Sequence, residues 1–306
     1  MLFGGSETSL FTKRELYLDF NKNKKRILHR FPKGIKSHSF HMYNGVDLNS
    51  LEYGMSDEEI KNLIESSFDF QSFSDGFFEK GKNKYGKTFW IEKTPGNAYL
   101  FKEFLETFED GKVIHISRNP IDTIFSLIKR GFNLLQACGI YLLNTSAALR
   151  SENSQSYLHV SYDQLIQNPD KSLSNIFSIL DLDFPREVLQ PGNPYGLEDT
   201  KISSWKYDET STITPQNSII PDEMREKILV AIHSILVAPK GKELFDLTYL
   251  SIPEISSRLG YQVETSPSNP RLISHLRTMK RMDRIDRLRR WYISGLKYPL
   301  YIKAQV

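Results

Sequence analysis

One segment of the sequence combines the features of an anion-binding turn. In residues 112–131 (KVIHISRNPIDTIFSLIKRG), a β-prone run ends at Arg118. Asn119 and Pro120 then favour the start of a helix, where free N–H groups attract an anion. Ser126 lies eight residues after Arg118, about two helical turns along the same helix. The segment therefore indicates a phosphate-type site, although an ordinary strand-to-helix turn with a surface arginine would show the same residues.

A second segment, residues 90–97 (WIEKTPGN), carries another cation at the end of a β-prone run. Lys93 and Thr94 would place an ammonium and a hydroxyl at the carboxyl edge of a sheet, where open α/β folds bind ligands. The alternative is structural, with Lys93 paired to Glu92 or Glu103 and Thr94 capping the next helix. By itself, this segment is weak evidence for a ligand site.

The elements around these segments alternate between strand and helix. A first strand is expected at Leu2–Phe3, and Ser56 and Glu59 form a capping box that opens a helix running to about Phe70. Further strands are expected over 87–92, 112–117 and 157–160, and further helices over 10–20, 98–108, 121–129, 133–150 and 169–180. This alternation predicts an α/β fold with a parallel sheet covered by helices.

Composition places the chain among ordinary globular proteins. Its 306 residues suffice for one sizeable core, and its scattered Gly and Pro suggest no linker between large domains. The single cysteine, Cys138, excludes an intrachain disulfide and is expected to be a packing residue in a helix. The sequence contains no apolar run of about 20 residues and no basic-then-apolar leader, so we expect a cytoplasmic protein.

The net charge of +3 is unevenly distributed. Residues 271–306 hold ten Lys or Arg against two Asp, a balance of +8, which leaves −5 for residues 1–270. We expect one domain over 1–265 and a basic helical extension over 266–306. The extension is expected to pack on or project from the same domain, and peripheral contact with an acidic surface is possible. The near absence of interleaved aromatic residues argues against nucleic-acid binding.

Several short motifs, in order, resemble those of the sulfotransferases that use 3′-phosphoadenosine 5′-phosphosulfate (PAPS), particularly the bacterial and glycan or tyrosylprotein branches. The matching residues are Glu92-Lys93-Thr94-Pro95, Arg118-Asn119-Pro120 with Ser126, Tyr162-Asp163-Gln164-Leu165, and Asn168-Pro169. The resemblance covers roughly residues 1–185, and Lys206 lies where the family often closes over the nucleotide. It implies a P-loop-like three-layer α/β/α fold with a central parallel sheet.

The family's phosphosulfate loop is altered in this chain. Ser6, Thr8 and Ser9 match the family pattern, whereas Gly5 replaces a basic residue and Glu7 replaces the loop glycine. Backbone N–H groups and hydroxyls still suit a phosphosulfate, but a carboxylate disfavours it. Lys13 or Arg14 could supply the missing positive charge.

The resemblance assigns a role to each remaining candidate. Lys93 would neutralise charge near the transferring group, and Arg118 and Ser126 would hold the 3′-phosphate of the nucleotide. Ser6, Thr8, Ser9, Lys13, Tyr162 and Lys206 complete the expected cofactor-binding set.

Sulfuryl transfer needs no metal, but it does need a base for the proton of the acceptor hydroxyl. The segment KGIKSHSFHMY offers His38 and His41, of which we favour His38, and Glu52 is the carboxylate alternative. His115, between two isoleucines, is expected to be a strand residue. The acceptor can be a carbohydrate, lipid, peptide or small metabolite.

Two other classes remain open. A degenerate sulfotransferase fold could bind a glycan or protein without catalysis, and Glu7 is the main feature in its favour. A P-loop kinase needs Gly-Lys-Ser/Thr at the end of the loop, where this chain has Phe11-Thr12-Lys13, and a metal-binding Asp after a later strand, where it has Arg118. The sequence therefore favours a sulfotransferase.

Overall fold

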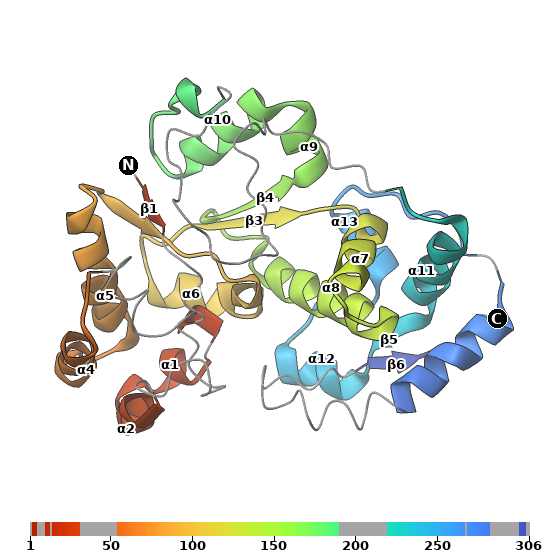
Figure 1. Ribbon diagram of the computed structural model, residues 1–306, viewed down its shortest axis with the longest axis horizontal. Helices are drawn as coiled ribbons and strands as arrows, with labels where there is room; N and C mark the ends of the chain where they lie inside the picture. Colours follow the sequence, from red (N-terminus) through yellow and green to blue (C-terminus); the bar gives the residue numbers. More distant parts are fainter. Residues whose placement is uncertain are drawn as a thin grey trace.

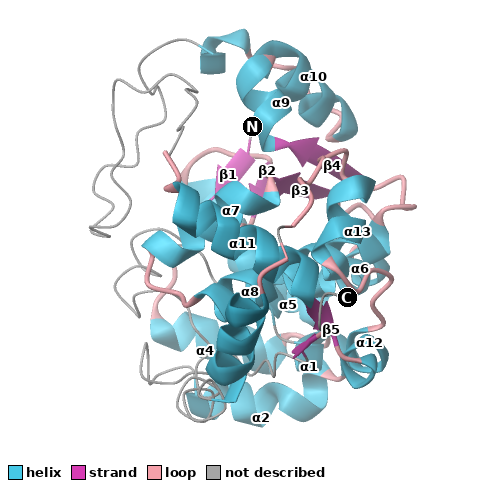
Figure 2. Ribbon diagram, turned by 90° about the vertical axis from the view of Figure 1, so that its right-hand side faces the viewer, coloured by secondary structure: helices cyan, strands magenta, loops and turns pink. Residues whose placement is uncertain are grey.

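The computed structural model describes most of the predicted α/β region (Figure 1). The residues it describes are 2–4, 10–12, 14–30, 54–189, 219–266, 268–281 and 300–303. Strands β1 to β4 lie in one layer, with α9 and α10 on one side and α6 and α8 on the other (Figures 1 and 2). The chain is therefore a mixed α/β protein, as the sequence predicts.

Four short strands form two parallel pairs. β1 (Leu2–Gly4) pairs with β2 (Phe89–Ile91), and β3 (Val113–Ser117) pairs with β4 (Tyr157–Ser161). In the described residues these hydrogen-bonded ladders are separate, so one continuous central sheet is not seen. A third pair, β5 (Ile235–Val237) with β6 (Leu300–Ile302), is antiparallel and was not predicted.

Helices make up most of the remaining described chain. Those before β3 are η1 (a 3₁₀ helix, Leu10–Thr12), α1 (Arg14–Leu18), α2 (Phe20–Arg30), α4 (Asp57–Ser66), α5 (Phe70–Lys84), η4 (3₁₀, Pro95–Leu100) and α6 (Phe101–Thr107). Those after β3 are α7 (Pro120–Lys129), α8 (Leu134–Ala148), η5 (3₁₀, Leu149–Ser151), α9 (Tyr162–Gln167), α10 (Pro169–Ile179), η6 (3₁₀, Arg186–Leu189), α11 (Asp222–Ser234), α12 (Pro239–Phe245) and α13 (Ile252–Arg258). Residues 270–281 are also helical.

Local capping explains where several helices begin. Ser56 accepts the N–H of Glu59 while Glu59 accepts the N–H of Ser56, which confirms the predicted capping box of α4. This helix ends at Ser66 rather than near Phe70, because Asp69 caps the separate helix α5. The helix expected over 98–108 begins earlier, as the 3₁₀ helix η4. The helix expected over 10–20 is divided into η1, α1 and the start of α2.

An aromatic core fixes the amino-terminal half of the described chain. Phe11 packs against Phe70 and Trp90, with ring centroids 5.3 and 5.4 Å apart, and Trp90 stacks on Phe78 at 4.5 Å. Burying an aromatic side chain contributes roughly 1.5–3 kcal/mol. This core therefore joins η1, α5 and β2, although they lie far apart in the sequence.

The larger core is built around α8. Helices α7, α11 and α13 pack around α8, and Cys138 on this helix is fully buried. Burial raises the pKa of the Cys138 thiol, so this residue is a packing residue, as predicted.

Part of the carboxyl-terminal segment packs on this same core. Ile273 and Leu276, in the helix over 270–281, are buried there. Leu300–Ile302 forms a strand and not a helix, which corrects the expectation of a helical extension over these residues, and residues 282–299 lie outside the described chain. Among the described residues, no helix has the length and apolar character needed to cross a bilayer.

Two histidines face each other across the β3–β4 ladder. His115 and His159 are register partners with ring centroids 5.6 Å apart. The Nδ1 of His115 lies 2.6 Å from the hydroxyl of Tyr157, and the Nε2 of His159 lies 2.7 Å from the Oγ of Ser117. Burial, together with the neighbouring His159, lowers the pKa of His115 to about 3, and burial lowers the pKa of His159. Both rings are therefore neutral at pH 7.

We predict that the free energy of unfolding decreases as the pH falls below about 6.5. The unfolded chain takes up a proton on His115 near the usual value of about 6.5, whereas the folded protein does so only near pH 3. Between these values, each decrease of one pH unit should lower the free energy of unfolding by up to about 1.4 kcal/mol because of this residue. Urea denaturation at pH 7.5, 6.5 and 5.5 measures the slope.

The matched controls for this prediction are single glutamine variants. His115→Gln should make the pH dependence shallower, whereas His275→Gln, at an exposed position, should leave it unchanged. An identical slope in His115→Gln and the unsubstituted protein would contradict the role of this residue.

Candidate functional site

The register of β3 and β4 brings two predicted site residues together. Ser117 pairs with Ser161 at the carboxyl ends of these parallel strands, so the next residues, Arg118 and Tyr162, emerge side by side. The guanidinium carbon of Arg118 lies 5.1 Å from the centre of the Tyr162 ring. This cation–π contact orients the Arg118 side chain at the edge of the sheet.

The amino terminus of α7 begins immediately after Arg118. Asn119 caps the helix by accepting the N–H of Ile121 at 2.9 Å, as the sequence predicts. The Nη2 of Arg118 lies 3.7 Å from Oδ2 of Asp122, and the Arg118 side chain is 25% exposed. Ser126 is one further turn along the helix, so it shares a face with Asp122. The cation of Arg118 therefore lies beside the amino terminus of α7, with a serine along the same face.

The turn that contains Lys93 is held by Glu92. Thr94 donates its hydroxyl to Oε1 of Glu92 at 2.6 Å, and the side-chain amide of Asn97 donates to Oε2 of the same carboxylate. Thr94 makes no side-chain capping bond to η4, so the capping alternative is wrong. Lys93 itself is exposed between these residues.

This turn packs closely against the residues that follow the predicted phosphosulfate loop. A Cβ atom added at Gly96 would lie 2.9 Å from Cγ2 of Thr12, so the close approach of η1 and η4 depends on glycine at this position. The parallel pairing of β1 with β2 aligns the same two segments. The structure thus places the segments before and after the loop beside the Lys93 turn.

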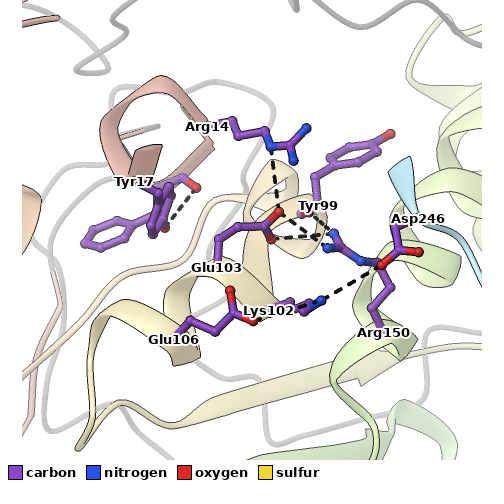
Figure 3. A network of polar contacts seen from close by, with 9 residues as sticks. Arg14, Tyr17, Tyr99, Lys102, Glu103, Glu106, Arg150 and Asp246 are labelled. Atoms are coloured by element: carbon purple, nitrogen blue, oxygen red, sulfur yellow. Dashed lines mark hydrogen bonds and ion pairs between the residues drawn. The ribbon is translucent and has the colours of Figure 1, made fainter. Parts of the chain in front are cut away.

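A partly buried ion-pair network anchors the same region (Figure 3). The Nη2 of Arg150 lies 3.4 Å from Oε1 of Glu103, and its Nη1 donates to the carbonyl of Tyr99 at 3.3 Å. The Nε of Arg14 lies 3.8 Å from the same Glu103 oxygen. Only 12% of the Glu103 side chain and 10% of the Arg150 side chain are exposed, so this pair is shielded from solvent. Arg150 therefore fixes η4 and α6 against the end of α8.

Tyr17 lies close to both acidic residues of this region. Its hydroxyl donates to the carbonyl of Phe11 at 3.2 Å. Burial raises the pKa of Tyr17 well above its usual value, and the charges of Glu92 and Glu103 raise it further. The phenol therefore remains protonated and links α1 to η1. Neither Tyr17 nor Arg150 could be predicted as a site residue from the sequence, because neither lies in a recognisable motif.

The other predicted site residues lie outside the described chain. They are Ser6, Thr8, Ser9, Lys13, His38, His41 and Lys206, together with Gly5, Glu7 and Glu52. Their assigned roles remain predictions. His115 is a buried strand residue, as predicted, and its ring faces His159.

A comparison with protein families covers the part of the chain that contains the ends of β3 and β4. The model of the sulfotransferase family matches residues 7–186, more than half of the chain and the region that holds Lys93, Arg118 and Tyr162. The chain belongs to the sulfotransferase family.

Comparisons with individual proteins are weaker. No curated protein matches the chain. Among solved structures, the sulfotransferase domain of the curacin biosynthetic pathway is 14% identical, with 86% of this chain and 98% of that chain covered and a TM-score of 0.44. The sulfotransferase domain of the Synechococcus PCC 7002 olefin synthase is 18% identical, with 86% and 94% covered and a TM-score of 0.38. Membership of the family rests on the family match.

We predict that Arg150→Met lowers the free energy of unfolding by about 3 kcal/mol, because it leaves the shielded Glu103 carboxylate without its main partner. Chemical denaturation at pH 7 measures the change. Arg14→Met is the matched control, since the Arg14 side chain is 57% exposed and pairs with the same carboxylate. Arg14→Met should lower the free energy of unfolding by less than about 1 kcal/mol. Equal effects of the two substitutions would contradict the structural role of Arg150.

Proposed function

We propose that this chain transfers a sulfuryl group from PAPS to the hydroxyl of an acceptor by in-line displacement. The observation that carries the proposal is the position of Arg118, which stacks on Tyr162 beside the amino terminus of α7. It lies within the region that matches the sulfotransferase family.

The residues at α7 fit a phosphate group. A guanidinium has five donors in a planar fork that matches phosphate oxygens, and its charge is permanent. The Arg118 cation lies over the Tyr162 ring, and the amino terminus of α7 adds a positive potential. In this proposal Arg118 and Ser126 hold the 3′-phosphate, and Tyr162 orients Arg118. In the structure Asp122 forms an ion pair with Arg118, so the Asp122 carboxylate must move away for Arg118 to bind the phosphate.

Lys93, an exposed residue, fits the transferring end of the donor. Bound PAPS would supply the sulfuryl group, which moves to the acceptor oxygen as the bond between sulfur and the phosphate oxygen breaks. Negative charge then develops on the departing phosphate, and Lys93 is proposed to neutralise it. The acceptor proton passes to a base, for which His38 and His41 are the candidates. Ser6, Thr8, Ser9, Lys13 and Lys206 complete the proposed donor site.

A binding module that lacks catalysis is the second candidate. Glu7, which replaces the loop glycine of the family pattern, favours it, because a carboxylate opposes a bound phosphosulfate. Calorimetric titration with adenosine 3′,5′-bisphosphate (PAP), the product of the donor, distinguishes the two. Binding supports the transferase, whereas no binding at millimolar PAP would contradict it.

We predict that Arg118→Ala weakens PAP binding by about 1.5–3 kcal/mol, because it removes a charge-assisted contact to the 3′-phosphate. Binding of adenosine 5′-phosphosulfate, which lacks this phosphate, should change little. Calorimetry measures both affinities. Arg258→Ala is the control, since that arginine pairs with Glu152 at 2.7 Å and has no proposed role in binding. An equal loss for both ligands would remove Arg118 from the assigned role.

We predict that Lys93→Ala lowers kcat by about 10²-fold or more and changes the affinity for PAP much less, because the ammonium acts on charge that develops in the transition state. Transfer of labelled sulfate to a panel of hydroxyl acceptors measures turnover, and calorimetry measures binding. Lys102→Ala is the control, because Lys102 lies on α6 in exposed ion pairs with Glu106 and Asp246. Unchanged turnover in Lys93→Ala with any active acceptor would exclude this role.

A further inference from the structure

A tyrosine from outside the family match bridges the two strand ends that carry Arg118 and Tyr162. The hydroxyl of Tyr261 lies 3.0 Å from the carbonyl oxygen of Ser117 and 3.1 Å from the Oγ of Ser161. These two serines are register partners, and each immediately precedes one member of the cation–π pair. A single side-chain oxygen therefore contacts both residues that determine where Arg118 and Tyr162 leave the sheet.

The local backbone explains how Tyr261 reaches this position. Helix α13 ends at Arg258, and Gly260 then adopts a φ of +79°, which favours glycine. The N–H of Tyr261 donates to the carbonyl of Ser256 at 2.7 Å, so the turn is closed by a hydrogen bond. Both ribbon views place α13 beside the β3–β4 pair (Figures 1 and 2). The turn thus directs the tyrosine from α13 to the carboxyl ends of the strands.

The Tyr261 hydroxyl is the donor toward two oxygens, the carbonyl of Ser117 and the Oγ of Ser161. A carbonyl oxygen cannot donate, so the contact with Ser117 requires the phenolic proton. The Oγ of Ser161, at 3.1 Å, is the second oxygen toward which the phenol points, and it also accepts the N–H of Gln164 at 3.4 Å as the cap of α9. Burial raises the pKa of Tyr261, so the phenol keeps its proton at pH 7. The bridge therefore connects the last carbonyl of β3 to the cap of α9.

We infer that Tyr261 is a positioning residue that sets the affinity for the 3′-phosphate of the donor by holding the Arg118–Tyr162 pair in place. This inference rests on the proposed function. Tyr261 touches neither the donor nor the acceptor in this scheme. It fixes the two strand ends, and through them the direction of the Arg118 guanidinium. The family match ends at residue 186, so Tyr261 lies in the part of the chain that the match does not cover.

The test is Tyr261→Phe, which removes only the hydroxyl. We expect the affinity for PAP to fall about 3- to 10-fold, the scale of one lost hydrogen bond, while the affinity for adenosine 5′-phosphosulfate stays within about 2-fold. Tyr249→Phe is the matched control, because it removes a tyrosine hydroxyl that donates to Glu152 at 3.1 Å, away from Arg118. It should leave both affinities unchanged.

A double-mutant cycle separates positioning from general stabilisation. If Tyr261 acts through Arg118, Tyr261→Phe should have no further effect on PAP affinity in the Arg118→Ala background. Additive losses, equal losses for both ligands, or unchanged PAP affinity in Tyr261→Phe would each overturn the inference. If the unsubstituted protein does not bind PAP, the proposed function fails, and the inference fails with it.

A second variant covers the case in which Tyr261→Phe does not fold. Ser161→Ala removes the other end of the bridge and leaves the contact between Tyr261 and the carbonyl of Ser117. We expect the same selective loss of affinity for PAP over adenosine 5′-phosphosulfate. An unselective loss, or none, would overturn the inference.

Discussion

The parallel register of β3 and β4 is the constraint on which the candidate site depends. It aligns Ser117 with Ser161, and therefore places Arg118 beside Tyr162. Because side chains alternate between the two faces of a strand, a slip of one residue would exchange the buried and exposed faces and separate this pair. The buried face of β3 is polar at His115 and Ser117, and each of these has a partner on β4, so the register is specified by hydrogen bonds as well as by packing.

A second constraint holds the Lys93 turn. Glu92 accepts hydrogen bonds from Thr94 and Asn97, and the nearby Glu103 is held by Arg150. The donors to Glu92 are neutral, whereas the charge of Glu103 is compensated by Arg150 and Arg14. The aromatic core around Phe11 fixes η1 against the same region. The turn is thus supported by packing on one side and by ion pairs on the other.

The sequence predicted much of the local structure correctly, and the reason is that these features depend on neighbouring residues. Asn119 caps α7 as expected, and Ser56 and Glu59 form the expected capping box. The prediction was less accurate where neighbouring elements decide the outcome. The strand at Leu300–Ile302 forms only because β5 provides its partner, and α4 ends early because Asp69 starts another helix. The propensity of a local segment cannot predict these contacts, because they involve residues of other elements.

By itself, the sequence determined the strand and helix types around Arg118 and the residues available for chemistry, because motif spacing and helix caps are local. Only the tertiary structure placed Arg118 on the Tyr162 ring, paired Glu103 with Arg150, and directed Tyr261 to Ser117. Residues 117 and 261 are 144 positions apart, and their hydrogen bond depends on the packing of α13 beside the β3–β4 pair. Such a contact has no sequence signature, since it arises from the folded arrangement of elements that local rules form separately.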